Sequence, residues 1–233
     1  MSQKNETTIL LLALLLTLGL VGIGAWVVKK FIFQDNVPAT SSTTIVESSS
    51  TAVKEQISFG EKSLFSVTSP AKRSGIEAIA ANKWSNAVTN LQQALKENPN
   101  EPETLIFLNH AKIAGQKSYT IAVVVPSGTD PNGSLEILRG VAQAQNEINA
   151  AGGIGGVPLK VAIANDNNQE DGAKKIATTL VNNSQVLGVI GHWASQATLA
   201  AAPIYTGKLV AISPISTSVI SGFSPYIFRT VPL

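Results

Sequence analysis

The chain has 233 residues, of which 44% are hydrophobic and only 14% are charged, and its formal net charge is +2. This length allows one or two domains of ordinary size. No long basic run is present, so the sequence lacks the electrostatic signature of a nucleic-acid-binding protein. The absence of cysteine excludes disulfides, thiol catalysis and a lipid-modified cysteine anchor. Because the two histidines, His110 and His192, stand far apart in the sequence, we expect no metal site, and we expect no cofactor.

Near the N-terminus, residues 9–28 form an uncharged stretch, ILLLALLLTLGLVGIGAWVV. About 20 apolar residues in a helix cross a bilayer core, whereas the apolar region of a cleavable signal peptide has about 7–15. We therefore expect residues 1–30 to be a transmembrane anchor, and Gly22–Gly24 leaves cleavage open as the alternative. Lys29 and Lys30 would place the bulk of the chain inside by the positive-inside rule. The downstream sequence favours the opposite, an extracytoplasmic location, which is the orientation we expect.

Residues 31–68 are predicted to be a linker, because PATSSTTIVESSSTAV (38–53) is rich in Ser and Thr and poor in large apolar residues. Residues 69–117 show a helical period, which Pro99 interrupts, and one apolar face of it comprises Trp84, Ala87, Val88, Leu91, Ala94 and Leu95. With Gly75, these positions resemble one and a half tetratricopeptide repeats. Such repeats need neighbours, so we expect the segment to pack on the next domain or on a partner. The alternative is a plain helical hairpin without a recognition role.

From residue 118 onward, short β-branched runs alternate with amphipathic segments. The predicted strands are YTIAVVV (119–125), LKVAIAN (159–165), VLGVI (186–190), LVAIS (209–213) and YIFR (226–229). The predicted helices cover 135–150, 172–182 and 195–205. This alternation predicts an α/β domain over 118–233 with a doubly wound parallel sheet and right-handed connections.

Open parallel sheets bind ligands beyond the carboxyl ends of their strands. Three predicted loops stand there, 126–134, 191–195 and 213–217, and they are rich in small polar residues. GHWAS (191–195) runs from a buried strand into a helix N-terminus, where unpaired N–H groups and the helix dipole favour an anion such as a carboxylate. Ser195 can add its hydroxyl group to such a site. The alternative is that Ser195 only caps its helix.

The sequence gives little support for a catalytic or a nucleotide-binding function. His192 and Ser195 could form a nucleophilic pair, but no acidic residue stands nearby in the sequence and the G-x-S-x-G elbow is absent. The glycine run 152–156 could suggest phosphate binding, but it follows a helix instead of linking a strand to one. We therefore interpret it as the end of that helix and a turn. Asp166 could bind the ribose of a dinucleotide, but the first loop lacks the G-x-G-x-x-G motif that would bind the pyrophosphate. We therefore expect Asp166 to brace the turn 165–168. We therefore expect a binding protein and not an enzyme.

Several segments stand in a characteristic order: AVVVPSG, LRGVAQAQNEINAAGGIGG, NDN, VIGHWASQAT, ISPISTS and IFRTVP. In their order and spacing they resemble the type I periplasmic binding proteins, closest to the branched-chain amino-acid (Leu/Ile/Val)-binding branch of ABC-transporter receptors. The resemblance covers 119–233 and implies the first part of lobe 1 of a two-lobed receptor. It also implies that the second lobe is missing, so that the product is truncated or needs another chain.

The resemblance assigns roles to particular positions. The family's serine after the third strand, which binds the α-carboxylate of an amino acid, falls on Ser195. The loop that binds the carboxylate and the ammonium group falls on 215–217, and the first loop corresponds to 127–134. Trp193 replaces a smaller apolar residue and either contacts the ligand or packs. The candidate ligand-binding residues are therefore Ser195, Ile215, Ser216, Thr217, Trp193 and Ser127.

The resulting expectation is a membrane-anchored, extracytoplasmic receptor for a small ligand, an amino acid, in an ABC-type uptake system. Its expected partners are the ligand, the membrane, and an ABC permease or a second-lobe chain. The alternative is a tethered scaffold or sensor whose helical repeat binds proteins and whose α/β part no longer binds a ligand.

Overall fold

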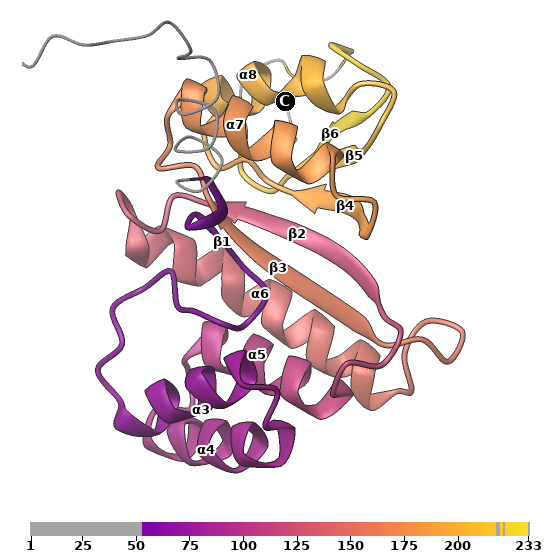
Figure 1. Ribbon diagram of the computed structural model, residues 1–233. Coiled ribbons are helices and arrows are strands. Elements are labelled where there is room, and N and C mark those ends of the chain that lie inside the picture. Colours follow the sequence, from indigo (N-terminus) through magenta and orange to yellow (C-terminus); the bar gives the residue numbers. More distant parts are fainter. Residues whose placement is uncertain (1–52, 218–219, 221, 233) are drawn as a thin grey trace, which may run out of the picture. The chain divides into compact units, whose positions relative to one another are not determined.

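A computed structural model describes residues 53–217, 220 and 222–232 (Figure 1). The predicted membrane anchor and most of the predicted linker lie outside the described residues. Within the described part of the chain, every helix is too short or too polar to span a bilayer.

Six strands of the described residues form one sheet in the order β1-β3-β2-β4-β5-β6. The strands are β1 (Ile57–Ser58), β2 (Tyr119–Val125), β3 (Leu159–Asn165), β4 (Val186–Ile190), β5 (Val210–Ser213) and β6 (Ile227–Arg229). Strands β2 to β6 are parallel to their neighbours, whereas β1 joins the edge of β3 in antiparallel pairing. The structure therefore confirms the predicted α/β class and parallel sheet.

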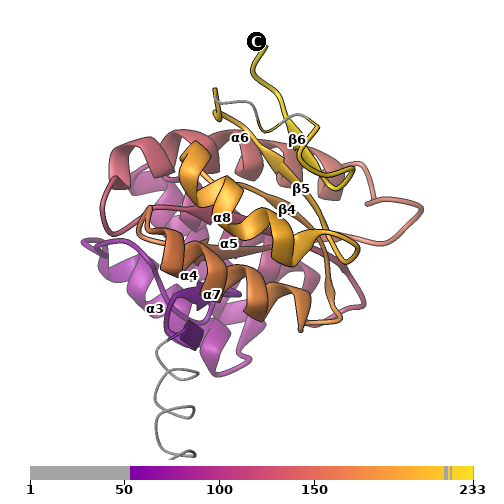
Figure 2. The ribbon, with the colours of Figure 1, turned by 90° about the horizontal axis from the view of Figure 1, so that it is seen from above.

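Helices cover both faces of this sheet. Helices α7 (Glu170–Val181) and α8 (Ser195–Tyr205) lie on one side, and α5 (Pro102–Ile113) and α6 (Pro131–Ala150) lie on the other (Figures 1 and 2). The alternation of side chains along β2 explains the two layers, since Ala122 and Val124 join the core with α7 and α8, while Val123 and Val125 join the core with α5 and α6. Strands buried on both faces read as continuous apolar runs.

Part of one sheet face carries exposed apolar side chains. Val210 and Ile212 of β5 are 41% and 40% exposed, and Phe228 of β6, paired in register with Ile212, is 49% exposed. Their neighbours Ala211 and Ile227 point into the core with α7 and α8 and are buried. Among the described residues, β5 and β6 are thus packed on one face only.

The helical segment before β2 comprises α3 (Pro70–Ala80), α4 (Trp84–Glu97) and α5. The predicted apolar face of α4 is present, with Ala87, Leu91 and Ala94 buried. Gly75 of α3 allows a close approach, because a Cβ atom there would collide with the Leu91 side chain. Helix α5 is buried along most of its length and packs on α6, so the segment continues into the core of the α/β part.

A buried ion pair ties this helical segment together. Lys72 Nζ lies 2.6 Å from Glu103 Oε2 and 3.1 Å from Glu101 Oε1, joining α3 to α5. Glu103 Oε1 also accepts a hydrogen bond of 2.9 Å from the Leu64 backbone N–H. Burial raises the pKa of the Glu103 carboxyl above its ordinary value, and the positive charge of Lys72 partly opposes this shift.

The structure differs from the predicted linker at its C-terminal end. Strand β1 pairs Ile57 with Ala164 and Ser58 with Ile163 of β3. The Phe59 carbonyl oxygen lies 2.8 Å from His110 Nδ1 of α5. These residues follow the Ser/Thr-rich stretch 38–53, and the open edge of β3 offers backbone hydrogen-bond partners to such an extended segment.

Candidate functional site

The candidate site lies at the edge where the parallel strands end, which we call the carboxyl edge. Four loops start there, after β2, β3, β4 and β5. The loop after β2 leads into α6, whose N-cap Asp130 accepts a hydrogen bond of 2.9 Å from the Gly133 N–H. This arrangement places the sequence-predicted ligand loops at one edge of the sheet.

Helix α8 begins immediately after the loop that follows β4. Ser195 is its first residue and is half-buried, and the N-cap position is occupied by Ala194, which has no side chain that could cap the helix. The alternative role of Ser195 as the N-cap residue is therefore wrong. The positive end of this helix, with its first N–H groups lacking a side-chain cap, faces the carboxyl edge.

The loop after β5 is attached to α8 by buried hydroxyl groups. The Ser216 Oγ lies 2.6 Å from Ser213 Oγ and 3.1 Å from Thr198 Oγ1. Ser213 Oγ also donates to the His192 carbonyl oxygen at 2.9 Å. Because its hydroxyl is engaged in this network and 1% exposed, Ser216 holds the two loops together and its side chain is turned away from the surface.

The neighbouring predicted residues are more accessible. Ile215 is half-buried and Thr217 is exposed, so both can contribute backbone or side-chain groups at the surface of the edge. Ser127, in the loop after β2, is buried, and its Oγ has no hydrogen-bond partner within the described residues. A buried hydroxyl needs such a partner, which a ligand or an ordered water can supply.

Trp193 connects the loop after β4 to the start of α6. A Cβ atom built on Gly133 would overlap the Trp193 ring, so the indole packs directly against this glycine. The ring is half-buried, which leaves part of it at the surface. Of the two roles predicted for Trp193, packing is thus present.

A buried network beneath these loops was missed by the sequence analysis. His192 Nδ1 lies 2.6 Å from Asp166 Oδ2, and His192 Nε2 lies 3.0 Å from the Tyr205 hydroxyl. Because a carboxylate oxygen accepts, Nδ1 donates to Asp166. Burial, and secondly the charge of Asp166, raise the pKa of Tyr205 above its ordinary range, so its hydroxyl stays protonated and can donate to Nε2. Asp166 Oδ1 also accepts from the Asn168 N–H at 2.9 Å, which is the turn-bracing role predicted for it.

This network corrects one step of the sequence argument. An acidic partner of His192 does exist, although it stands 26 residues away in the sequence. The only available signal was that Asp166 and His192 each follow a strand that ends at the same edge. The histidine nevertheless does not activate Ser195, because its two ring nitrogens contact Asp166 and Tyr205 and the side chain is 0% exposed. The arrangement is suited to holding loops in place and not to nucleophilic catalysis.

Residues 118–233, which contain the candidate site, are similar to known proteins. Residues 118–233 match the model of a family described as periplasmic binding protein. An amino acid binding protein from Pseudomonas aeruginosa is 31% identical over a region covering 49% of this chain and 32% of that protein. Residues 118–233 therefore belong to the periplasmic binding protein family, as the sequence resemblance predicted.

Two solved structures are also similar. An ABC transporter substrate-binding protein from Desulfitobacterium hafniense, in complex with Leu, is 30% identical with a TM-score of 0.46, and the match covers 50% of this chain and 35% of that one. A branched-chain amino acid transporter substrate binding protein from Streptococcus pneumoniae, in complex with isoleucine, is 30% identical with a TM-score of 0.46, covering 48% and 33%. The chain spans about a third of the length of these relatives. The matched family and the Pseudomonas aeruginosa relative are both described as binding proteins, the class that the sequence resemblance predicted.

Proposed function

We propose that this chain is a receptor that binds an amino acid through its α-carboxylate at the carboxyl edge of the sheet. In this proposal the receptor serves an ABC-type uptake system, with an ABC permease as its partner. The proposal is supported by the family to which residues 118–233 belong and by the 31% sequence identity to an amino acid binding protein. The single observation that carries it is the start of α8, which follows the short loop after β4 and has no side-chain cap.

A carboxylate is the ligand group that suits this position best. The first N–H groups of a helix carry partial positive charge and lack partners within the helix. Helix N-termini bind carboxylates and phosphates for this reason. In the proposed site, Ser195 adds its hydroxyl and its own N–H to the N–H groups of the first turn.

The loop after β5 is proposed to supply the opposite side of the site. The Ser216 hydroxyl is held by Ser213 and Thr198, which fixes the backbone of residues 215–217 beside the first turn of α8. Ile215 then offers backbone groups, and the exposed Thr217 offers a hydroxyl to the carboxylate or the ammonium group of the ligand. Trp193 and Ser127 are proposed to border the site from the loops after β4 and β2.

The remaining segments receive supporting roles. We propose residues 1–30 as a membrane anchor, 31–68 as a tether that ends by joining β1 to the sheet, and 69–117 as a tetratricopeptide-like segment packed on the ligand-binding lobe, 118–233. The uncharged stretch 9–28 supports the anchor, with the folded part outside the cytoplasm. Alkaline phosphatase fused after Val53 should be active, and carbonate washing should leave the protein in the membrane fraction. An inactive fusion would contradict the orientation, and release by carbonate would contradict the anchor.

Isothermal titration of the full chain in detergent micelles with a panel of amino acids tests the proposed activity. Ser195→Ala should weaken binding by about ten- to a hundredfold, since a hydrogen bond to a charged group contributes about 1.5–3 kcal/mol. Ser85→Ala, on the exposed side of α4, is the matched control and should leave affinity unchanged. If no amino acid binds, the receptor proposal fails and the tethered-scaffold alternative takes its place.

A further inference from the structure

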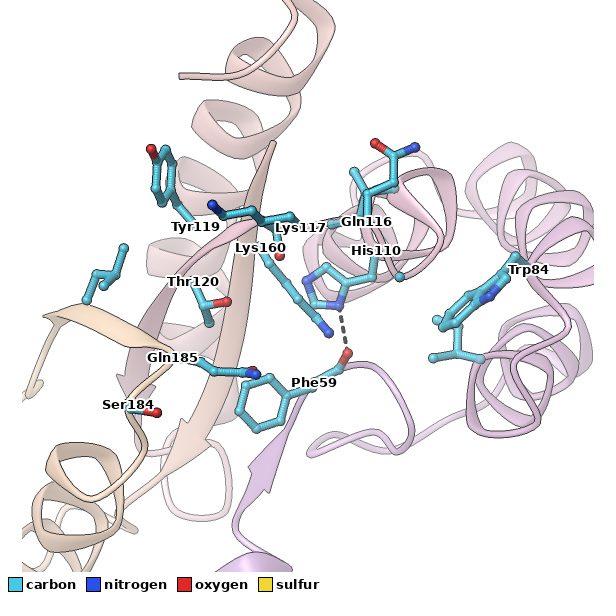
Figure 3. A pocket seen from close by; sticks show the side chains of 15 residues that line it. Phe59, Trp84, His110, Gln116, Lys117, Tyr119, Thr120, Lys160, Ser184 and Gln185 are labelled. Carbon is cyan, nitrogen blue, oxygen red and sulfur yellow. Dashed lines mark hydrogen bonds between the residues drawn. The ribbon is translucent and has the colours of Figure 1, made fainter. Parts of the chain in front are cut away.

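A cavity lies at the opposite end of the sheet from the proposed amino-acid site. It has a volume of about 500 Å³ and is formed where β2 and β4 begin, against β3 and α5 (Figure 3). We call it the amino-end cavity. Because β2 has seven residues, the two ends of the strand are about 20 Å apart, and a ligand in this cavity cannot touch the carboxyl edge.

Lys160 places a positive charge in the amino-end cavity. Its side chain lies between Phe59 and His110 (Figure 3), with Nζ 5.5 Å from the centre of the Phe59 ring. Among the described residues, no carboxylate lies within 4.0 Å of this ammonium group. Burial lowers the pKa of Lys160, and the charge of Glu61 only partly opposes this shift. A half-buried cation without an ion-pair partner is costly, and an anion in the cavity would remove that cost.

The residues that line the cavity place no negative charge beside Lys160. None of the residues lining the cavity is acidic, and Lys117 adds a second positive charge (Figure 3). His110 cannot contribute a switchable charge. Its Nδ1 donates to the Phe59 carbonyl oxygen at 2.8 Å and its Nε2 accepts from the Val161 N–H at 3.2 Å, so the ring is neutral and fixed.

The rest of the lining suits an organic molecule better than a bare ion. Phe59, Ile113 and Leu187 give apolar walls, and Thr120 and Gln185 add polar groups near the strand starts. Leu187 is 56% exposed, an unusual state for a leucine on a strand of the central sheet. Cavities that bind small molecules typically have volumes of about 300–1,000 Å³, with apolar walls and a few polar groups that fix orientation.

We propose that the amino-end cavity is a second binding site, which takes a small organic anion with its carboxylate or phosphate group at Lys160 and its apolar body against Phe59 and Leu187. The site is independent of the amino-acid site at the carboxyl edge. Its walls come from both the helical segment and the α/β part, since His110 and Ile113 of α5 line it together with residues of β2, β3 and β4. An occupant therefore stabilises the packing of the two parts on each other.

Ligand-observed NMR on the full chain in detergent micelles tests the proposal, with hexanoate, hexyl phosphate and hexanol as probes. The two anions should bind and the neutral alcohol should bind at least tenfold more weakly, and the stronger anion identifies the preferred head group. Lys160→Met should weaken binding of that anion by about ten- to a hundredfold, the loss expected for one charge-assisted hydrogen bond. Lys160→Arg, which keeps the charge, should retain most of the affinity.

Two controls separate this site from the proposed amino-acid site and from non-specific binding. Lys208→Met removes an exposed lysine after α8 and should change nothing. Ser195→Ala should leave binding of the probe anions unchanged, even if it abolishes amino-acid binding. Equal binding of hexanol and the anions, or an equal effect of Lys160→Met and Lys208→Met, would overturn the proposal. If Lys160→Met does not fold, the comparison of anions with hexanol on the parent chain and on Lys160→Arg decides.

Discussion

The Asp166 carboxylate and the His192 imidazole lie 2.6 Å apart, from Oδ2 to Nδ1, and both side chains are buried. Asp166 follows β3 and His192 follows β4, yet these strands are not neighbours, because β2 lies between them. The contact therefore spans β2 and joins two loops of the carboxyl edge. It fixes the backbone that leads through Trp193 to the start of α8.

Removing this contact should lower stability. Asp166→Ala leaves the buried His192 Nδ1 without its acceptor, and we expect the free energy of unfolding to fall by about 1–3 kcal/mol. Urea unfolding followed by tryptophan fluorescence measures the change. Asp166→Asn should recover much of the loss, because the amide oxygen can accept from Nδ1. An Asp166→Ala variant with an unchanged free energy of unfolding would show that the pair does not stabilise the edge.

The two glycines of α6 should respond in opposite ways to alanine. At Gly133 a methyl group would overlap the Trp193 ring and Asp130, so we expect Gly133→Ala to destabilise the protein by about 1–3 kcal/mol. At Gly140 there is nothing within 4 Å, and alanine should stabilise the helix by up to about 1 kcal/mol. Thermal unfolding of both variants gives the comparison. Equal shifts would mean that the Trp193 packing does not constrain this position.

The stability of the fold should depend on pH through His110. Burial, and secondly the charge of Lys160, lower its pKa from 6.5 to about 3. The unfolded chain binds a proton near pH 6.5 while the folded protein does not until about pH 3. The contribution of neutral His110 to the free energy of unfolding is therefore fully present above pH 6.5. It decreases as the pH falls toward 3, by up to about 1.4 kcal/mol per pH unit. In His110→Gln this component of the pH slope should vanish, and an unchanged slope between pH 6.5 and 3 would contradict the assignment.

The ion pair between Lys72 and Glu103 should be important because it is buried. Lys72→Met leaves the Glu103 carboxylate, which is 0% exposed, without its counter-charge, and we expect a loss of about 3–5 kcal/mol. Lys62→Met removes the exposed pair with Glu55 and should cost at most about 1 kcal/mol. Chemical unfolding of the two variants tests the contrast, and similar losses would argue against a structural role for Lys72.

Much of the fold could be predicted from the sequence because its strands are buried on both faces. The bounds predicted for β2, β3 and β4 agree with the structure, since short apolar runs of this kind are typical of strands that are buried on both faces. Helix α6 begins four residues before the predicted start, because Asp130 and Pro131 supply an N-cap and an N1 residue that the apolar period does not reveal.

Long-range contacts were the part that the sequence could not supply. Strand β1 has two residues without a periodic pattern, and only the open edge of β3 explains its pairing. The Asp166–His192 contact depends on strand order, which local patterns do not determine. The same holds for Ser216, whose buried hydroxyl is engaged by Ser213 and Thr198, although the family resemblance suggested a role toward the ligand.

The central claim is that a ligand carboxylate binds at the N-terminus of α8. Calorimetric titration of the full chain with leucine and with isopentylamine, the same molecule without its carboxylate, tests this claim most directly. We predict that leucine binds and that the amine binds at least tenfold more weakly, with Ser195→Ala reducing only the affinity for leucine. Equal affinities for leucine and isopentylamine would contradict the account, because no carboxylate site would then operate at this edge.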